Sequence, residues 1–135
     1  MFSYENESYS GLPDNCVLVC PKHKLHRYLY GLILPLIRSR EYRQCHVFRC
    51  FHPSAAVPAI VGKLFFKKKF IFNFNYDYQA LAKVEGKGNL VPFLYFIEFL
   101  AFKFTDRVFV ADEKMLEYAN KYVTQKKITL IRNGV

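Results

Sequence analysis

The chain has 135 residues, which is enough for one domain with a sizeable core and too few for two. Apolar residues make up 52% of the chain and aromatic residues 18%, a composition that excludes intrinsic disorder. The formal net charge of +9 favours partners that carry phosphate, such as nucleic acid, sugar nucleotides or an anionic membrane surface, without choosing among them.

The first part of the chain is predicted to be a tail followed by a strand and a helix. Residues 1–15 are polar and rich in turn formers, so we expect a tail there. Residues 16–20 have the short apolar pattern of a buried strand. A nearly all-apolar helix over about 27–39 should kink at Pro35, because proline removes a backbone donor.

The middle of the chain contains the clearest strand. Residues 46–51 form one strand, and Ser54 stands where it can cap a helix over about 55–66. Small residues, among them Gly62, allow that helix to pack closely. Residues 70–75 are an aromatic and apolar run between three lysines and several turn formers, which is the pattern of a buried strand.

The last part of the chain continues the alternation. We expect short helical turns, a long helix capped by Asn89, a strand, a helix opened by Asp112 and a final strand. The expected limits of the short helical turns, the long helix and the two strands are residues 78–85, about 90–104, 107–111 and 128–131.

This alternation predicts an α/β fold. Strands separated by helices imply a Rossmann-like parallel sheet of about five strands flanked by helices, in one domain over residues 16–131. In such sheets ligands bind beyond the carboxyl ends of the strands. The side chains that follow each predicted strand are therefore the first candidates for a functional site.

The helix over 90–104 carries apolar residues on two sides. One stripe is expected to pack on the sheet and consists of Phe93, Phe96, Ile97, Leu100 and Phe104. The other is predicted to be a membrane or partner surface, with an ordinary solvated face or a subunit contact as the alternative. It consists of Tyr95, Phe99, Phe102 and the neighbouring Lys103.

No stretch of the chain has the pattern of an export signal or a membrane span. The most apolar helix contains Glu98 and Lys103 and is shorter than the roughly 18 residues that a span requires. We therefore expect a cytoplasmic protein, with peripheral contact to the inner face of a membrane as a further option. Reduced thiols are the default in that compartment.

The cysteine and histidine residues suggest zinc only weakly. Structural zinc ligands stand on tight turns, whereas the cysteine pairs here, Cys16 with Cys20 and Cys45 with Cys50, enclose apolar strand residues. Buried structural thiols are the favoured interpretation, and no metal site is predicted. No arrangement typical of nucleophilic catalysis and no nucleotide-binding glycine pattern is present, so no catalytic residue is identified.

Four segments, in this order along the chain, resemble the N-terminal half of the retaining GT-B-fold glycosyltransferases, the group 1 or family 4-like enzymes. They are the segments QCHVFRCFHP, FIFNFNYD, TDRVFVA and KITLIRNGV, at residues 44–53, 70–77, 105–111 and 127–135. Each is similar to a strand of that family together with the residues that follow it. The resemblance covers about residues 28 to 135.

The resemblance implies half of a GT-B fold and an acceptor-side role. In the family, a hexosyl group moves from a sugar nucleotide to a glycan or a lipid-linked acceptor, and no cofactor is permanently bound. The sugar nucleotide is held by a C-terminal domain, which implies a second domain or separate subunit as partner. Residues 132–135 would begin the linker, with Asn133 and Gly134 as the hinge. With the second domain absent, we expect the chain alone to be inactive and to oligomerise.

The candidate cleft residues follow three of the predicted strands. They are His52, Pro53, Ser54, Asn75, Tyr76, Asp77 and Asp112. A purely structural interpretation stays open for several of them, because Asp77 and Ser54 can cap helices and His52 can be solvated. Two other functions also stay open. One is a non-enzymatic basic module that binds nucleic acid, although no specific nucleic-acid motif is present, and the other is a subunit that recruits a catalytic partner to a membrane.

Overall fold

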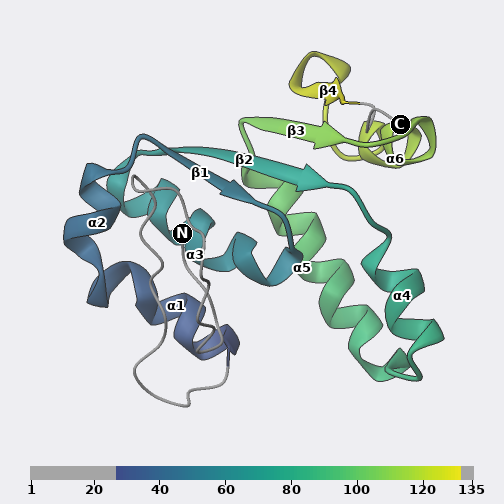
Figure 1. Cartoon of the computed structure of the whole chain (residues 1–135), viewed down its shortest axis with the longest axis horizontal. Coiled ribbons are helices and arrows are strands. Elements are labelled where there is room, and N and C mark those ends of the chain that lie inside the picture. The colour runs from purple at the N-terminus through teal and green to yellow at the C-terminus, as the bar shows by residue number, and fades with distance from the viewer. Residues whose placement is uncertain (1–26, 132–135) are drawn as a thin grey trace, which may run out of the picture.

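A computed structural model of the chain describes residues 27–131 (Figure 1). The predicted tail over 1–15, the predicted strand over 16–20 and the predicted hinge at Asn133 and Gly134 lie outside the described residues. The described elements, in chain order, are α1 (Arg27–Ile37), α2 (Ser39–Gln44), β1 (Val47–Cys50), α3 (Pro53–Phe66), β2 (Lys69–Phe74), α4 (Tyr78–Val84), η1 (Gly88–Leu90), α5 (Val91–Phe104), β3 (Arg107–Val110), α6 (Glu113–Asn120), η2 (Gln125–Lys127) and β4 (Ile128–Leu130).

The strands form one parallel sheet, in the order β1-β2-β3-β4. The register places Phe48 of β1 beside Phe70 of β2, and Phe72 of β2 beside Val108 of β3. The predicted α/β fold with a Rossmann-like parallel sheet flanked by helices is therefore confirmed. The described part of the chain supplies four of the roughly five expected strands, because the segment expected to form the other one is residues 16–20.

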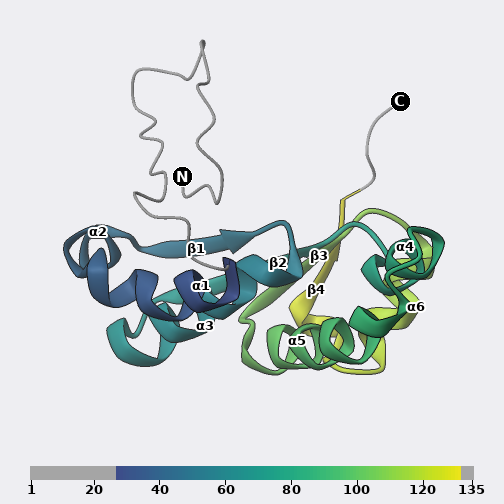
Figure 2. The same cartoon turned by 90° about the horizontal axis from the view of Figure 1, so that it is seen from below.

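Consecutive strands are neighbours in this sheet, and right-handed crossovers then place the connecting helices on one face. Figure 2 shows α1, α3 and α5 together on that side of the sheet. The strand side chains on the helix-covered face are buried, and they are Phe48, Cys50, Phe70, Phe72, Phe74, Val108 and Val110. The alternate side chains form what we call the outer face, and they are Val47, Arg49, Lys69, Ile71, Asn73, Arg107, Phe109 and Thr129.

The core is a layer of aromatic rings between β2, α5 and α6. Phe102 of α5 makes edge-to-face contacts with Phe72 and Phe74, at centroid distances of 5.3 and 5.2 Å. On its other side Phe102 stacks on Tyr122, at 5.1 Å with an interplanar angle of 6°. Tyr118 of α6 stacks on Phe74 at 5.2 Å. Such ring pairs contribute stabilisation beyond the area they bury.

The prediction for the faces of the long helix is correct for Ile97, which is buried, and for Tyr95 and Phe99, which are exposed, but it was wrong for three other residues. Phe102, expected on an exposed surface, is 1% exposed, whereas Phe93 and Phe96, expected on the sheet, are 39% and 54% exposed. The fully buried Ala101 beside Phe102 lets the helix approach the sheet on that side. Because α5 is apolar nearly all round, its sequence pattern does not specify which side is buried.

Two helix limits also differ from expectation. The helix expected over about 27–39 ends at Ile37, just after Pro35, and α2 follows as a separate short helix. Asn89 does not cap the long helix, because it lies inside the 3-10 turn η1 and the capping position falls on Leu90, which makes no side-chain cap. None of the helices within residues 27–131 is both long and apolar enough to cross a membrane.

Gly62 of α3 lies against two aromatic rings. A Cβ atom added there would lie 2.6 Å from Phe48 Cε2 and 2.8 Å from Tyr42 Cε1. Both rings are buried, and they contact each other at 4.7 Å. Neither ring has room to move aside, so the absence of a side chain at residue 62 is required by the packing.

We predict that Gly62→Ala destabilises the protein by about 1–3 kcal/mol, because overpacking outweighs the better helix propensity of alanine. Chemical denaturation monitored by circular dichroism measures the change. Gly88→Ala is the matched control, because a Cβ atom at Gly88 meets nothing within 4 Å. Equal stability of the two variants would contradict the tight packing at Gly62.

Candidate functional site

The carboxyl end of β1 leads directly into α3 through His52. The His52 ring Nδ1 accepts a hydrogen bond from the Ser54 backbone N–H at 3.1 Å, and lies 2.7 Å from the Ser54 hydroxyl. His52 is therefore the helix cap, and the prediction that Ser54 has this role was wrong. The helix begins one residue earlier because Pro53 occupies its first turn, where proline is favoured. Pro53 and Ser54 are both buried.

Three ring side chains gather where β1 and β2 end. The rings of His52 and Tyr78 are in edge contact at 4.5 Å, and Tyr76 lies 6.2 Å from Tyr78. The Tyr78 hydroxyl donates a hydrogen bond to the Phe51 carbonyl at 2.6 Å, which ties the start of α4 to the end of β1. Tyr76 is 67% exposed. We call His52, Tyr76 and Tyr78 the aromatic rim.

The predicted acidic residues act as helix caps. Asp77 Oδ1 accepts a hydrogen bond from the Ala80 N–H at 2.9 Å, and Asp112 Oδ1 accepts one from the Met115 N–H at 2.8 Å. The structural alternative for Asp77 is thus confirmed, although both carboxylates remain exposed. Asn75 is half-buried at the end of β2. Asp112 follows β3, one strand further along the same sheet edge.

A buried carboxyl group beside the rim was missed by the sequence analysis. Glu98 of α5 is only 2% exposed, and its Oε2 accepts a hydrogen bond from Gln79 Nε2 at 2.7 Å. Gln79 Nε2 also donates to the Tyr118 hydroxyl at 3.0 Å, and that hydroxyl lies 3.5 Å from Glu98 Oε2. Glu98 Oε1 has no hydrogen-bond partner among the described residues. We call Gln79, Glu98 and Tyr118 the buried acid network.

The environment of Glu98 changes its protonation. The pKa of Glu98 is raised from 4.5 to about 7, chiefly by burial and to a smaller extent by the negative charge of Asp77, while the hydrogen bonds from Gln79 and Tyr118 act to lower it. Burial also raises the pKa of Tyr78, with smaller contributions from Tyr76 and Glu98. The network and the rim are thus electrically coupled. A carboxyl group that titrates near neutral pH can donate or accept a proton under ordinary conditions.

The sequence did contain a signal for this network. Glu98 is an acidic residue within an otherwise apolar helix, and such a residue is either on a solvated face or buried with partners. The choice depends on which side of α5 faces the sheet. Because the sequence pattern does not specify that side, Glu98 was not identified as a candidate site residue.

The described cysteines are free thiols. Cys50 is buried, its Sγ donates a hydrogen bond to the Ala55 carbonyl at 3.0 Å, and burial raises the pKa of Cys50 to about 12. Cys45 is half-buried. Within residues 27–131, no three side chains from His, Cys, Asp and Glu are grouped so that they could hold a metal ion.

The fold and the site together define an α/β protein with a Rossmann-like parallel sheet and an aromatic rim at the carboxyl edge of β1 and β2. Comparison with known proteins found no matching protein-family model and no matching curated protein. Of the predicted cleft residues, the structure brings His52 and Tyr76 together through Tyr78, and it leaves Asp112 at the next strand.

We predict that Glu98→Gln stabilises the protein at alkaline pH. Because the pKa of Glu98 is raised in the folded state, ionisation destabilises folding progressively between the usual pKa of 4.5 and about 7. The unfolding free energy of the variant should exceed that of the parent by on the order of 2 kcal/mol at about pH 8, and equal it at about pH 4.

Urea denaturation across this pH range measures the effect. Glu117→Gln, which removes an exposed carboxylate from α6, is the control and should keep the pH dependence of the parent. A Glu98→Gln variant that is less stable than the parent at every pH would show that the ionised carboxylate is required for packing.

Proposed function

We propose that the protein is the acceptor-side half of a glycosyltransferase. In this proposal the aromatic rim holds a glycan or lipid-linked acceptor, and a sugar nucleotide is held by a second domain or a separate subunit. The observation that carries the proposal is the gathering of His52, Tyr76 and Tyr78 at the carboxyl ends of two adjacent parallel strands. This edge is where α/β sheets bind their ligands.

The chemistry of the rim suits a sugar. A tyrosine ring offers an apolar face, on which the C–H face of a hexose can pack, and a hydroxyl group that can hydrogen-bond the sugar hydroxyls. Tyr76 is exposed and free of any role in the core, while Tyr78 is held by its hydrogen bond to the Phe51 carbonyl, directly after β1. A fixed ring beside an exposed one is a partly preformed surface, which lowers the entropy cost of binding.

Hexosyl transfer also requires that donor and acceptor be positioned together. Binding both reactants in one cleft supplies a large part of the rate acceleration in reactions of this kind. The rim would form the acceptor wall of such a cleft, and the sugar nucleotide would be a substrate rather than a resident cofactor. The resemblance of the four sequence segments to GT-B enzymes supports this division of roles.

We predict that Tyr76→Ala weakens acceptor binding by roughly three- to tenfold, which is the usual contribution of one aromatic contact. Saturation-transfer NMR with methyl α-glucoside and methyl α-mannoside, followed by titration, measures the binding. Phe65→Ala is the matched control, because Phe65 is 72% exposed on α3 and belongs to no ring contact described above. The proposal fails if neither glycoside contacts the rim, or if the two variants bind equally.

A second candidate function is nucleic-acid binding, and the composition of the outer face favours it. The strand positions of this face include Arg49, Lys69 and Arg107 but no Asp or Glu. Arg49 lies over the rings of Phe51 and Phe109, at 5.0 and 5.4 Å. Exposed sheet surfaces with cations and aromatic rings bind single strands by charge and base stacking.

Filter binding of random single-stranded oligonucleotides at two salt concentrations separates the two functions. If the sheet surface binds nucleic acid, affinity should fall steeply with salt, and Arg49→Gln should reduce it. If the acceptor-side proposal holds, we expect only weak binding that Arg49→Gln does not change.

A further inference from the structure

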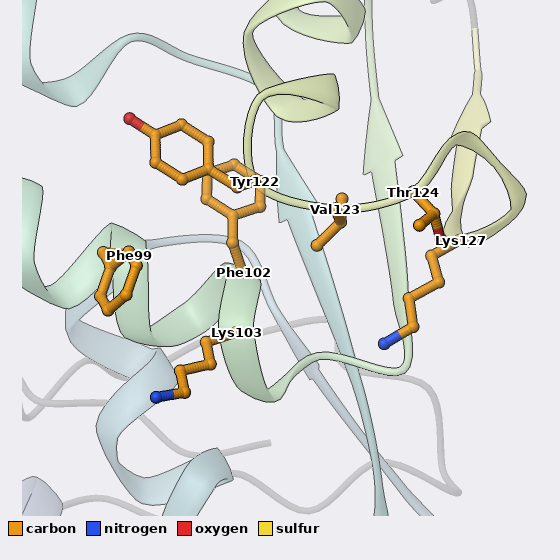
Figure 3. A pocket seen from close by; sticks show the side chains of 7 residues that line it. All are labelled: Phe99, Phe102, Lys103, Tyr122, Val123, Thr124 and Lys127. Carbon is orange, nitrogen blue, oxygen red and sulfur yellow. The ribbon is translucent and has the colours of Figure 1, made fainter.

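A cavity of about 280 Å³ lies between the C-terminal half of α5 and the segment that joins α6 to β4. Figure 3 shows the side chains that line it, which are Phe99, Phe102, Lys103, Tyr122, Val123, Thr124 and Lys127. Lys103 is in the last turn of α5, just before β3, and Lys127 directly precedes β4. The cavity therefore lies toward the amino ends of β3 and β4, whereas the aromatic rim lies at the carboxyl ends of β1 and β2.

One wall of the cavity is fixed by the core. Phe102 is fully buried and stacks on Tyr122, and in Figure 3 these two rings overlap at one side of the cavity. The Tyr122 hydroxyl lies 3.4 Å from the Tyr118 hydroxyl, so this ring is also joined to the buried acid network. The wall is thus an aromatic surface that is formed before any ligand arrives.

Two lysine side chains give the entrance of the cavity a positive charge. Lys103 lies on one side with its Nζ 5.9 Å from the centre of the Phe99 ring, and Lys127 reaches in from the other side (Figure 3). Among residues 27–131, no acidic side chain lines the cavity. Lys127 Nζ makes a weak hydrogen bond to the Thr105 carbonyl at 3.4 Å, and none of the salt bridges among the described residues includes Lys127.

Asp106, which interacts electrostatically with Lys127, already has other partners. The positive charge of Lys127 acts to lower the pKa of Asp106. The Asp106 carboxylate is nevertheless bound elsewhere, because its Oδ1 accepts a hydrogen bond from Lys63 Nζ at 2.6 Å and its Oδ2 accepts one from the Phe70 N–H at 2.8 Å. The positive potential at the cavity is therefore only partly compensated. Thr124 adds a hydroxyl donor to the same wall.

Exposed apolar side chains continue from the cavity along α5. Tyr95 and Phe99 are both exposed, and the Tyr95 ring lies 6.5 Å from that of Tyr122. Phe96 beside them is exposed as well. A small anion would contact the lysines but not this apolar surface. A ligand with an anionic group and an apolar body would contact both the lysines and the apolar side chains.

We propose that this cavity binds a phosphate group attached to an apolar or aromatic body. The charges of Lys103 and Lys127 on opposite sides of the cavity would attract the phosphate, with Thr124 as a further donor, and the Phe102–Tyr122 wall with exposed Phe99 would contact the body. An anionic phospholipid and a nucleoside monophosphate share this chemistry. The inference does not depend on glycosyl transfer, because it concerns different residues at the other end of the strands.

Isothermal titration of the full chain tests the proposal with four probes. Dihexanoyl phosphatidic acid and AMP each carry a phosphate on a body, inorganic phosphate has no body, and dihexanoyl phosphatidylcholine has the lipid body without net charge. We expect one of the first two to bind at least about tenfold more tightly than the last two. The tighter of phosphatidic acid and AMP identifies the source of the phosphate.

Two double variants of equal net charge test the site itself. Lys103→Gln with Lys127→Gln should weaken phosphate-dependent binding by about tenfold or more. Lys83→Gln with Lys114→Gln removes two exposed lysines from α4 and α6, away from the cavity lining, and should leave binding unchanged. Val123→Phe keeps all the charges and fills the cavity, so it should also abolish binding.

The proposal is overturned if the two double variants lose affinity equally, because binding would then reflect net charge alone. It is also overturned if no probe binds, or if phosphatidylcholine binds as tightly as phosphatidic acid. Circular dichroism of each variant confirms that loss of binding does not come from loss of folding.

Discussion

The packing of α5 against β2 determines where the other helices of the second half of the domain can lie. Strand β2 presents Phe70, Phe72 and Phe74 to one face, and Phe102 fits against the last two. Tyr118 of α6 and Tyr122, which follows α6, then stack on Phe74 and Phe102 of this layer. Because interiors are close-packed, a rotation of α5 would displace all of these contacts at once. The aromatic layer thus fixes α5 and α6 relative to the sheet.

Both candidate sites depend on that layer. The stacking of Phe74 on Tyr118 places α6 beside the carboxyl end of β2, close to the rim, while the stacking of Phe102 on Tyr122 forms the wall of the cavity. The two sites therefore lie at opposite ends of one rigid aromatic body. A ligand at either site would rest on side chains that are already held in place, which favours specific recognition over loose adsorption.

The buried acid network reduces the folding stability of the aromatic layer when Glu98 is ionised. A carboxyl group with a partnerless Oε1 and little exposure is destabilising when ionised, and Gln79 and Tyr118 offset this cost only in part. The same bonds join α4, α5 and α6 into one unit. The protonation of Glu98 therefore bears directly on the hydrogen bonds that join these three helices.

The sequence by itself determined the strands, the helix order and the parallel α/β fold. Short aromatic and apolar runs between lysines and turn formers mark β2, and capping residues such as Asp77 and Asp112 mark the helices that follow, because these signals are local. Only the tertiary structure decided which side of α5 is buried, since a helix that is apolar all round has no periodic signal. That choice placed Phe102 and Glu98 inside, and with them it formed the buried acid network and the cavity wall.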